Sequence, residues 1–217
     1  VSTLHDAYGL GSGVGDVNLG SYSGSVAVDA RTIAVGIGAG ADYIEFADQE
    51  PPVSPEGFGD LTISGDFSGD VTVTSANGFA CRGLAAEPLP TQGNVTDSAA
   101  ITVTVTNTES PDDGVAIGAI NNLVIVGDMA GAVTATACEA GGIAGMGSMT
   151  LGAMSGSITV NGGELADGMK GQSIEIVGDL SGNITVNASD NEAYGIDAQS
   201  GDVTIGGDLS GTVSVSA

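Results

Sequence analysis

A four-residue motif recurs seven times along the chain and constrains its fold more than any other feature. The motif reads Gly, then Leu, Ile, Val or Met, then a variable residue, then usually Ala, Gly or Ser. Spacings between successive copies are 27, 47, 31, 28, 26 and 27 residues. Periods in this range are typical of repeat architectures, in which each unit stacks on the next. The copies begin at Gly9, Gly36, Gly83, Gly114, Gly142, Gly168 and Gly195.

Each repeat carries two further extended segments after the motif. The second segment alternates apolar and polar residues, as in residues 17–19 and 174–176, and the third does the same, as in 71–73 and 184–186. Alternation with period two and β-branched residues indicates half-buried strands. No comparable stretch has helical periodicity, so the sequence predicts an all-β fold.

A five-residue corner with a nearly fixed sequence joins the second segment to the third. Residues 178–182 read Gly-Asp-Leu-Ser-Gly, and 207–211 repeat them. We expect the central apolar residue to turn inward and plug the corner. Glycine permits left-handed backbone angles, and Asp or Ser can bond to the local backbone, so both residue types suit a sharp turn.

Three strands per turn, each stacked on its equivalent in the next repeat, predict a parallel three-sided β-helix (β-solenoid). We expect one domain over residues 1–217, with about seven rungs and a right-handed coil. A hairpin meander is disfavoured, because it would need two-residue turns such as Asn-Gly between adjacent strands. The interior must be narrow, since the chain has 37 Gly and no Trp. Insertions are predicted at about 41–59, as a protruding loop after rung two, and at 87–92 and 108–113.

The charge balance excludes several partners. The chain has 27 acidic residues and 3 basic ones, for a formal net charge of −24. Nucleic acids and anionic membranes are disfavoured, because binding phosphates needs Lys and Arg. No apolar stretch is long enough to span a membrane. Strong self-repulsion must be screened by salt or divalent cations wherever units pack closely, which suits an extracellular setting.

The two ends of the chain are almost in phase with each other. Residues 6–10 closely match residues 192–196, and the chain ends on a third strand without a helical cap. Open solenoid ends expose strand edges that invite further pairing. We therefore expect either a longer solenoid or units that stack head to tail, with a filament as the product. The predicted interface residues are Val213 and Val215 at one end and Tyr8, Leu10, Val17 and Leu19 at the other.

Threonines dominate the outward positions of the third strands. Arrays of this kind resemble those of ice-binding β-solenoids, in which regular hydroxyl and methyl groups order water. Alternatively, exposed Thr is simply a good strand former, and the flat face is a lateral contact between filaments. The predicted lateral or ice-binding face comprises Thr72, Thr74, Thr102, Thr104, Thr134 and Thr136.

The corner aspartates are weak calcium candidates, since calcium takes carboxylates and backbone carbonyls. They are Asp66, Asp128, Asp179 and Asp208, and capping of the turns is the alternative role. We expect no required cofactor. Cys81 and Cys138 lie two repeats apart, roughly 10 Å, which is too far for a bridge without distortion. We expect two thiols, with a disulfide within or between chains as the alternative.

The sequence predicts no enzyme. The three basic residues (Arg31, Arg82 and Lys170) are scattered, and His5 has no evident partner. A glycan-active β-helix enzyme is a lesser alternative, which would need carboxylates that converge in a groove.

The recurring Gly-Asp-Leu-Ser-Gly corner, the Val-Thr-Val strand and the Gly-Ile-x-Ala strand resemble a known class of repeats. They are similar to the β-strand repeats of large secreted microbial surface proteins, the adhesin and haemagglutinin-like parallel β-helix solenoids. This resemblance implies an extracellular or cell-surface location and a structural role in adhesion, coating or filament formation. The implied partners are further copies of the chain, with glycans or cell surfaces as additional ones.

Overall fold

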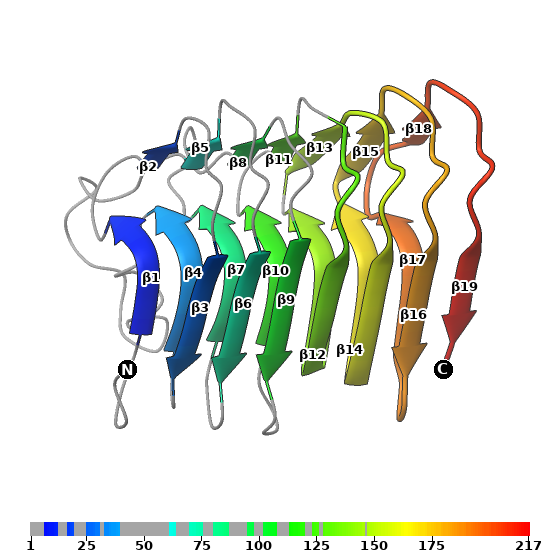
Figure 1. The fold of residues 1–217 in the computed structure, drawn as a ribbon. Helices are drawn as coiled ribbons and strands as arrows, with labels where there is room; N and C mark the ends of the chain where they lie inside the picture. Colours follow the sequence, from blue (N-terminus) through cyan, green and yellow to red (C-terminus); the bar gives the residue numbers. More distant parts are fainter. Residues whose placement is uncertain are drawn as a thin grey trace.

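In the computed structural model of the 217-residue chain, the described residues lie mainly in β-strands. All strand pairs are parallel, and the described residues contain no helix, so the predicted parallel β-solenoid is confirmed. Strands of the same kind lie side by side along the coil, with the chain ends at opposite ends of the stack (Figure 1). The described residues are 7–12, 17–19, 25–30, 33–39, 61–63, 70–75, 80–86, 95–97, 102–107, 113–119, 123–125, 128–145 and 147–217.

Three strands make up each turn. Motif strands are β1 (Ala7–Ser12), β4 (Ile33–Ala39), β7 (Ala80–Ala86), β10 (Asp113–Ala119), the later parts of β12 (Val133–Gly145) and β14 (Ile158–Gly171), and β17 (Glu192–Ala198). Second strands are β2 (Val17–Leu19), β5 (Leu61–Ile63), β8 (Val95–Asp97), β11 (Leu123–Ile125), β13 (Ser148–Leu151), β15 (Ser173–Ile176) and β18 (Val203–Ile205). Third strands are β3 (Ser25–Ala30), β6 (Asp70–Ser75), β9 (Thr102–Asn107), the first parts of β12 and β14, β16 (Ile184–Ala188) and β19 (Val213–Ser216).

The three kinds of strand form two sheets. Second strands make a seven-stranded sheet, and the motif and third strands share a twelve-stranded one. They share it because β12 and β14 each run from a third strand directly into the next motif strand. A register shift between Ala137 and Glu139 marks the bend in β12.

The predicted seven rungs are more than the structure describes in full. The seven-stranded sheet takes a strand from every repeat. However, only the part from Asp113 onward is described almost completely, corners included. This part makes about four turns. The predicted insertions at 41–59 and 87–92, and residues 108–112 of the third, lie outside the described residues; Asp113 begins β10.

The fourth motif copy is not where the sequence pattern placed it. Gly114 pairs with Cys81 and Ala140, two positions ahead of the motif glycine. Ile117 pairs with Leu84 and Ile143, so Ala116 takes the glycine position. Both readings fit the pattern because a shift of two residues keeps every side chain on the same face of a strand.

The motif glycine is a steric requirement of the core. A Cβ on Gly142 would lie 2.6 Å from the carbonyl oxygen of Gly168 and 2.7 Å from Cγ2 of Ile158. The motif strand is therefore pressed against the inward side chains of the third strand in its own turn. Inward apolar residues of all three strands are fully buried, among them Ile117, Leu123, Ile143, Leu151, Ile174 and Val186.

The corner residues behave as predicted in position but not in backbone conformation. Met129, Met154, Leu180 and Leu209 pair in one column, and the first three are at most 2% exposed, so they plug the corner. Gly156 has no left-handed φ angle, contrary to the expectation. Its Cβ would instead overlap the carbonyl oxygen of Gly131, so stacking of the corners demands glycine.

Candidate functional site

The last turn of the coil presents an uncovered cross-section, which we call the C-terminal face. Its strands, β17, β18 and β19, each pair with one neighbour only, within the part of the chain that the structure describes. Val213 and Val215, both predicted interface residues, are 42% and 46% exposed. The preceding turn carries Ile184 and Val186 at the paired positions, and both are fully buried.

Backbone groups on this face point outward from the stack. In the turn before it, the amide of Ile184 donates to Thr212 O at 2.8 Å, and that of Leu180 donates to Asp208 O at 3.0 Å. Equivalent amides of the last described turn, on Val213 and Leu209, point away from the rest of the stack. Unpaired donors and acceptors beside apolar side chains form a template for a further strand layer.

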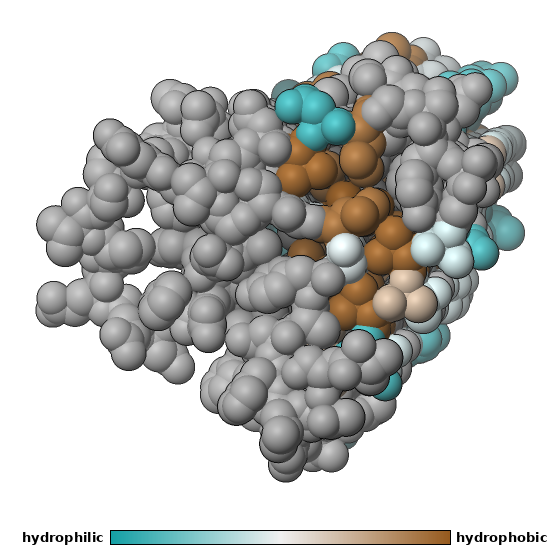
Figure 2. All heavy atoms as spheres, turned by 60° about the vertical axis from the view of Figure 1, so that its left-hand side comes forward, coloured by the Kyte–Doolittle hydropathy of each residue, from teal (hydrophilic) through white to brown (hydrophobic). Residues whose placement is uncertain are grey.

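The opposite end, which we call the N-terminal face, is more covered. Leu10 is 37% exposed, and Val17 and Leu19 are half-buried. Val26 and Val28, however, are only 7% and 6% exposed, unlike their counterparts in the last turn. Figure 2 brings this end forward and shows apolar side chains gathered in the middle of the surface. Tyr8 pairs with Val35 through the backbone, and its side chain lies outside the described residues.

The strand register corrects the predicted threonine face. Thr102 pairs with Asp70, whereas Thr104 pairs with Thr72 and Thr134. The sequence pattern places this strand two residues out of register, a slip that preserves the outward face. Thr106, which the prediction missed, takes the place beside Thr74 and Thr136. One column therefore runs Ala27, Thr72, Thr104, Thr134, Thr159, Thr185, Ser214, and its neighbour runs Asp29, Thr74, Thr106, Thr136, Asn161, Asn187, Ser216.

The second of these columns ends in a ladder of side-chain hydrogen bonds. Asn187 Nδ2 donates to Asn161 Oδ1 at 3.1 Å, and Ser216 Oγ donates to Asn187 Oδ1 at 2.9 Å. The ladder joins three successive turns on the outer surface. It continues to the C-terminal face, where Ser216 is exposed.

The corner aspartates bond to the next turn. Asp179 Oδ1 accepts a hydrogen bond from the amide of Asp208 at 2.8 Å, and Asp128 Oδ1 accepts a longer one, 3.4 Å, from the amide of Ala153. Asp66 lies outside the described residues. Nowhere in the described ranges do three Asp, Glu, His or Cys side chains gather as a metal site requires. Asp128 and Asp179 therefore tie neighbouring corners together.

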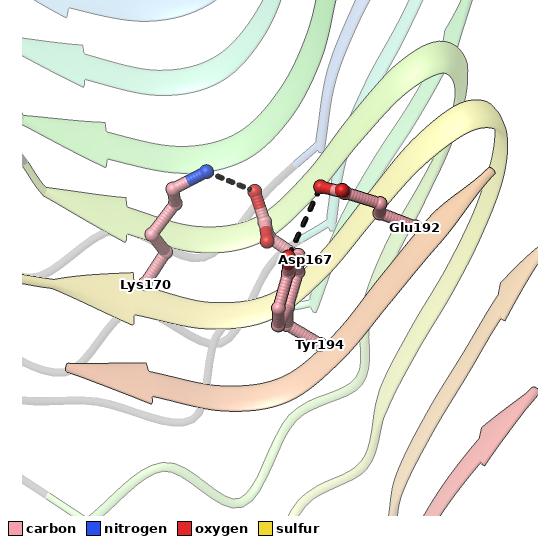
Figure 3. A network of polar contacts seen from close by, with 4 residues as sticks. All are labelled: Asp167, Lys170, Glu192 and Tyr194. Carbon is pink, nitrogen blue, oxygen red and sulfur yellow. Dashed lines mark hydrogen bonds and ion pairs between the residues drawn. The ribbon is translucent and has the colours of Figure 1, made fainter. Parts of the chain in front are cut away.

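A polar network that the sequence did not single out lies on the outer face of β14 and β17 (Figure 3). Lys170 Nζ contacts Asp167 Oδ2 at 2.7 Å, and the Asp167 side chain is only 7% exposed. The other carboxylate oxygen of Asp167, Oδ1, is buried without a hydrogen-bond partner. An ion at this depth is costly unless it is fully paired.

Burial sets the protonation of this pair. Lost hydration raises the pKa of the Asp167 carboxyl, because it outweighs the hydrogen bond and charge of Lys170. Asp197 and Glu192 push that pKa in the same upward direction. Partial burial alone would lower the pKa of Lys170, but the hydrogen bond and charge of Asp167 hold it above its ordinary value.

Tyr194 and Glu192 form the second half of the network, at the rim of the C-terminal face. The Tyr194 hydroxyl donates to Glu192 Oε2 at 3.0 Å, and the tyrosine is 40% exposed. This hydrogen bond, with the negative charge of Glu192, raises the pKa of the Tyr194 phenol. Tyr194 is directly paired with Asp167 in the neighbouring turn. A charged residue at an outward motif position was the only sequence signal for this cluster.

The cysteines are separated. Cys138 forms no disulfide and lies half-buried near the bend of β12. Cys81 belongs to a motif strand, where it pairs with Ala34 and Gly114.

Fold and surface together define a parallel β-solenoid with one open apolar end, a threonine-rich side and corners tied by aspartate. Comparisons with family models, curated proteins and solved structures find no match to this chain. No family is therefore assigned. The described part of the chain holds no helix long and apolar enough to cross a membrane.

Proposed function

We propose that the chain is a structural extracellular subunit that stacks end to end into a filament, matrix or cell-surface layer. The observation that carries this proposal is the C-terminal face, where three edge strands and the apolar residues Val203, Leu209, Val213 and Val215 stand exposed. Burial of such apolar area is favourable, and strand edges add hydrogen bonds. A head-to-tail contact that does not close into a ring generates a fibre.

The setting follows from composition and resemblance. A net charge of −24 suits a saline exterior, in which repulsion between subunits is screened. The corner and strand repeats resemble those of secreted adhesin-like solenoids, which favours a surface location and a role in adhesion. We propose no catalytic role and no required cofactor.

Polymer formation tests the proposal. Light scattering and electron microscopy of the protein, over a range of concentration and salt, are expected to detect rods longer than one chain. Monodisperse single chains under all of these conditions would count against the assembly function.

A matched pair of variants tests the role of the C-terminal face. Val215→Asp places a carboxylate on that face, whereas Val177→Asp adds the same charge to a 59% exposed side-wall valine in the turn before it. We expect Val215→Asp to raise the concentration needed for polymers about tenfold or more, because tenfold corresponds to only about 1.4 kcal/mol and burying an unpaired charge costs more. Equal effects of both variants would exclude this face as the contact.

The threonine column supports a second candidate function, ice binding. The register aligns Thr72, Thr104, Thr134, Thr159 and Thr185 on consecutive turns. Adjacent turns are about 4.8 Å apart, so the column has a regular spacing. Thermal hysteresis of the wild type, lost in Thr134→Tyr with Thr159→Tyr, is the expected result for this function. Absence of hysteresis in the wild type would eliminate it.

A further inference from the structure

We propose that a second copy of the chain docks on the C-terminal face in one register, which places Tyr8 of the incoming copy beside Tyr194. This inference rests on the proposed end-to-end assembly and specifies its partner and geometry. The first turn of the incoming copy then takes the place of the next turn of the coil.

Equivalent positions in the motif fix this register. Tyr194 immediately precedes the motif glycine Gly195, and Tyr8 immediately precedes Gly9. Within the chain, residues at this position pair with one another from turn to turn, as Tyr8 pairs with Val35 and Tyr194 with Asp167. An added turn that follows the same rule therefore pairs position 8 with position 194.

The other strands of the two faces agree with the same register. It sets Leu10 against Ile196 in the motif strands and Leu19 against Ile205 in the second strands. In the third strands, Val26 holds the position equivalent to Val213, but it is only 7% exposed, so the motif and second strands carry the argument. Every one of these pairs joins two apolar residues at core positions. A slip by one residue would instead turn polar residues toward the interior, which disfavours that slip.

The junction is best detected at the motif strands, because residues of these strands are exposed at both ends of the stack. Leu10 is 37% exposed, whereas Val26 in the third strand of the same turn is 7% exposed. On the opposing face, Tyr194 is 40% exposed and its hydroxyl is held by Glu192 at 3.0 Å. Parallel neighbours are about 4.8 Å apart, so this register brings the backbones at positions 8 and 194 to about that distance.

Head-to-tail docking is favoured over pairing of two C-terminal faces. All strand pairs described in the molecule are parallel, and a head-to-tail copy continues that pattern. Two identical C-terminal faces would have to pair about a two-fold axis, with antiparallel strands, a pairing that no described strand pair shows.

Oxidative cross-linking of tyrosine distinguishes these arrangements, because two adjacent phenols couple to fluorescent dityrosine. The chain has 4 tyrosines, Tyr8, Tyr22, Tyr43 and Tyr194. In a Tyr22→Phe and Tyr43→Phe background, one protein also carries Tyr8→Phe and the other Tyr194→Phe. Each then keeps a single tyrosine, and phenylalanine preserves the ring. Both are mixed at low salt, polymerised at high salt and photo-oxidised with a ruthenium complex and persulfate.

Dityrosine is expected in the mixture and is expected to be absent from either protein oxidised alone. Mass spectrometry should then identify the linked peptides as those that contain residues 8 and 194. Dityrosine in the protein with only Tyr194 would establish face-to-face pairing and overturn the proposal. Polymers in the mixture without any dityrosine would overturn the register while leaving end-to-end assembly intact. Absence of polymers in the wild-type protein would contradict the proposed assembly function as a whole.

Discussion

Asp167 is the residue whose environment conflicts most with its charge. Its carboxylate is buried, one oxygen has no partner, and Lys170 compensates only the other. Because burial raises its pKa, the folded chain binds a proton at this site more tightly than the unfolded chain does. The stability that this proton binding contributes is present below the unfolded pKa and is lost as pH rises through the folded pKa. Ionisation of Asp167 therefore lowers the stability of the folded chain.

Asp167→Asn is accordingly expected to stabilise the protein at pH 7.5, by about 1 kcal/mol, as expected when a buried charge becomes a neutral polar group. Urea unfolding at pH 7.5 and at pH 3 would measure the change, which should shrink at the lower pH, where the wild-type carboxyl is neutral. Asp202→Asn, which removes an exposed charge, serves as the control. A variant less stable than the wild type at pH 7.5 would show that the ion pair with Lys170 outweighs burial.

For single residues, the sequence predicts which face of a strand a residue occupies better than it predicts which residues are paired. Alternation predicts which threonines share one face of a strand, but it could not distinguish Thr102 from Thr104, because both satisfy a period of two. The pairing of Thr104 with Thr72 is set by the register between β6 and β9, and this register depends on how the whole turn packs. The burial of Asp167 could not be predicted from its charged outward position alone, because burial of an outward side chain depends on the neighbouring strands.

At the scale of elements, the motif strand and the third strand of one turn are fitted to each other. The other six repeats carry glycine at the motif position, and a close contact with the third strand is described for Gly9, Gly142, Gly168 and Gly195. The fourth repeat has Ala116 there, which is fully buried. In that repeat the third strand carries Ala135, whose partners in the adjacent turns are Val105 and Val160. The smaller residue in one strand thus makes room for the larger residue in the other.

This fit predicts a coupled pair of substitutions. Ala135→Val alone should overpack the contact and destabilise the protein by about 1–3 kcal/mol. Combined with Ala116→Gly, it reproduces the arrangement of the other repeats and should recover most of that loss. Chemical denaturation of both single variants and the double variant measures the coupling. Additive effects would show that these two positions do not share one contact.

The corner offers a second test, at two equivalent leucines. Leu180 is 1% exposed and Leu209, its partner in the last turn, is 60% exposed. Leu180→Ala should cost about 2–5 kcal/mol of unfolding free energy, as buried Leu→Ala changes do, and Leu209→Ala far less. Thermal and urea unfolding at low salt, where single chains prevail, would compare the two. A large loss in Leu209→Ala would mean that this corner is already covered in the single chain.

The corners and the motif also show what sequence reasoning could and could not obtain. Both were found as elements because their glycines recur in phase. The physical reason assigned to the corner glycines was wrong: Gly156 and its equivalents Gly182 and Gly211 have no left-handed φ angle. What requires glycine is the carbonyl of the turn below, and a contact between distant residues cannot be read from local turn chemistry.

At the scale of the molecule, charge opposes the apolar attraction between ends. The last turn, residues 190–217, carries Asp190, Glu192, Asp197, Asp202 and Asp208 and no basic residue. An incoming acidic copy is therefore repelled until salt screens the interaction, and the Debye length falls from about 30 Å at 0.01 M to about 10 Å at 0.1 M. Assembly should consequently increase with ionic strength.

Asp208→Asn is expected to lower the salt concentration at which polymers form. Asp208 occupies the corner position whose counterpart, Asp179, accepts a hydrogen bond from the next turn, and asparagine keeps an accepting oxygen while it removes the charge. Asp128→Asn removes the same charge from a corner inside the stack, so it is the matched control and should shift the midpoint little. Light scattering during titration with NaCl, MgCl2 and CaCl2 gives the midpoints. Equal effects of magnesium and calcium indicate screening, whereas assembly in calcium alone would contradict it and restore the corner aspartates as calcium ligands.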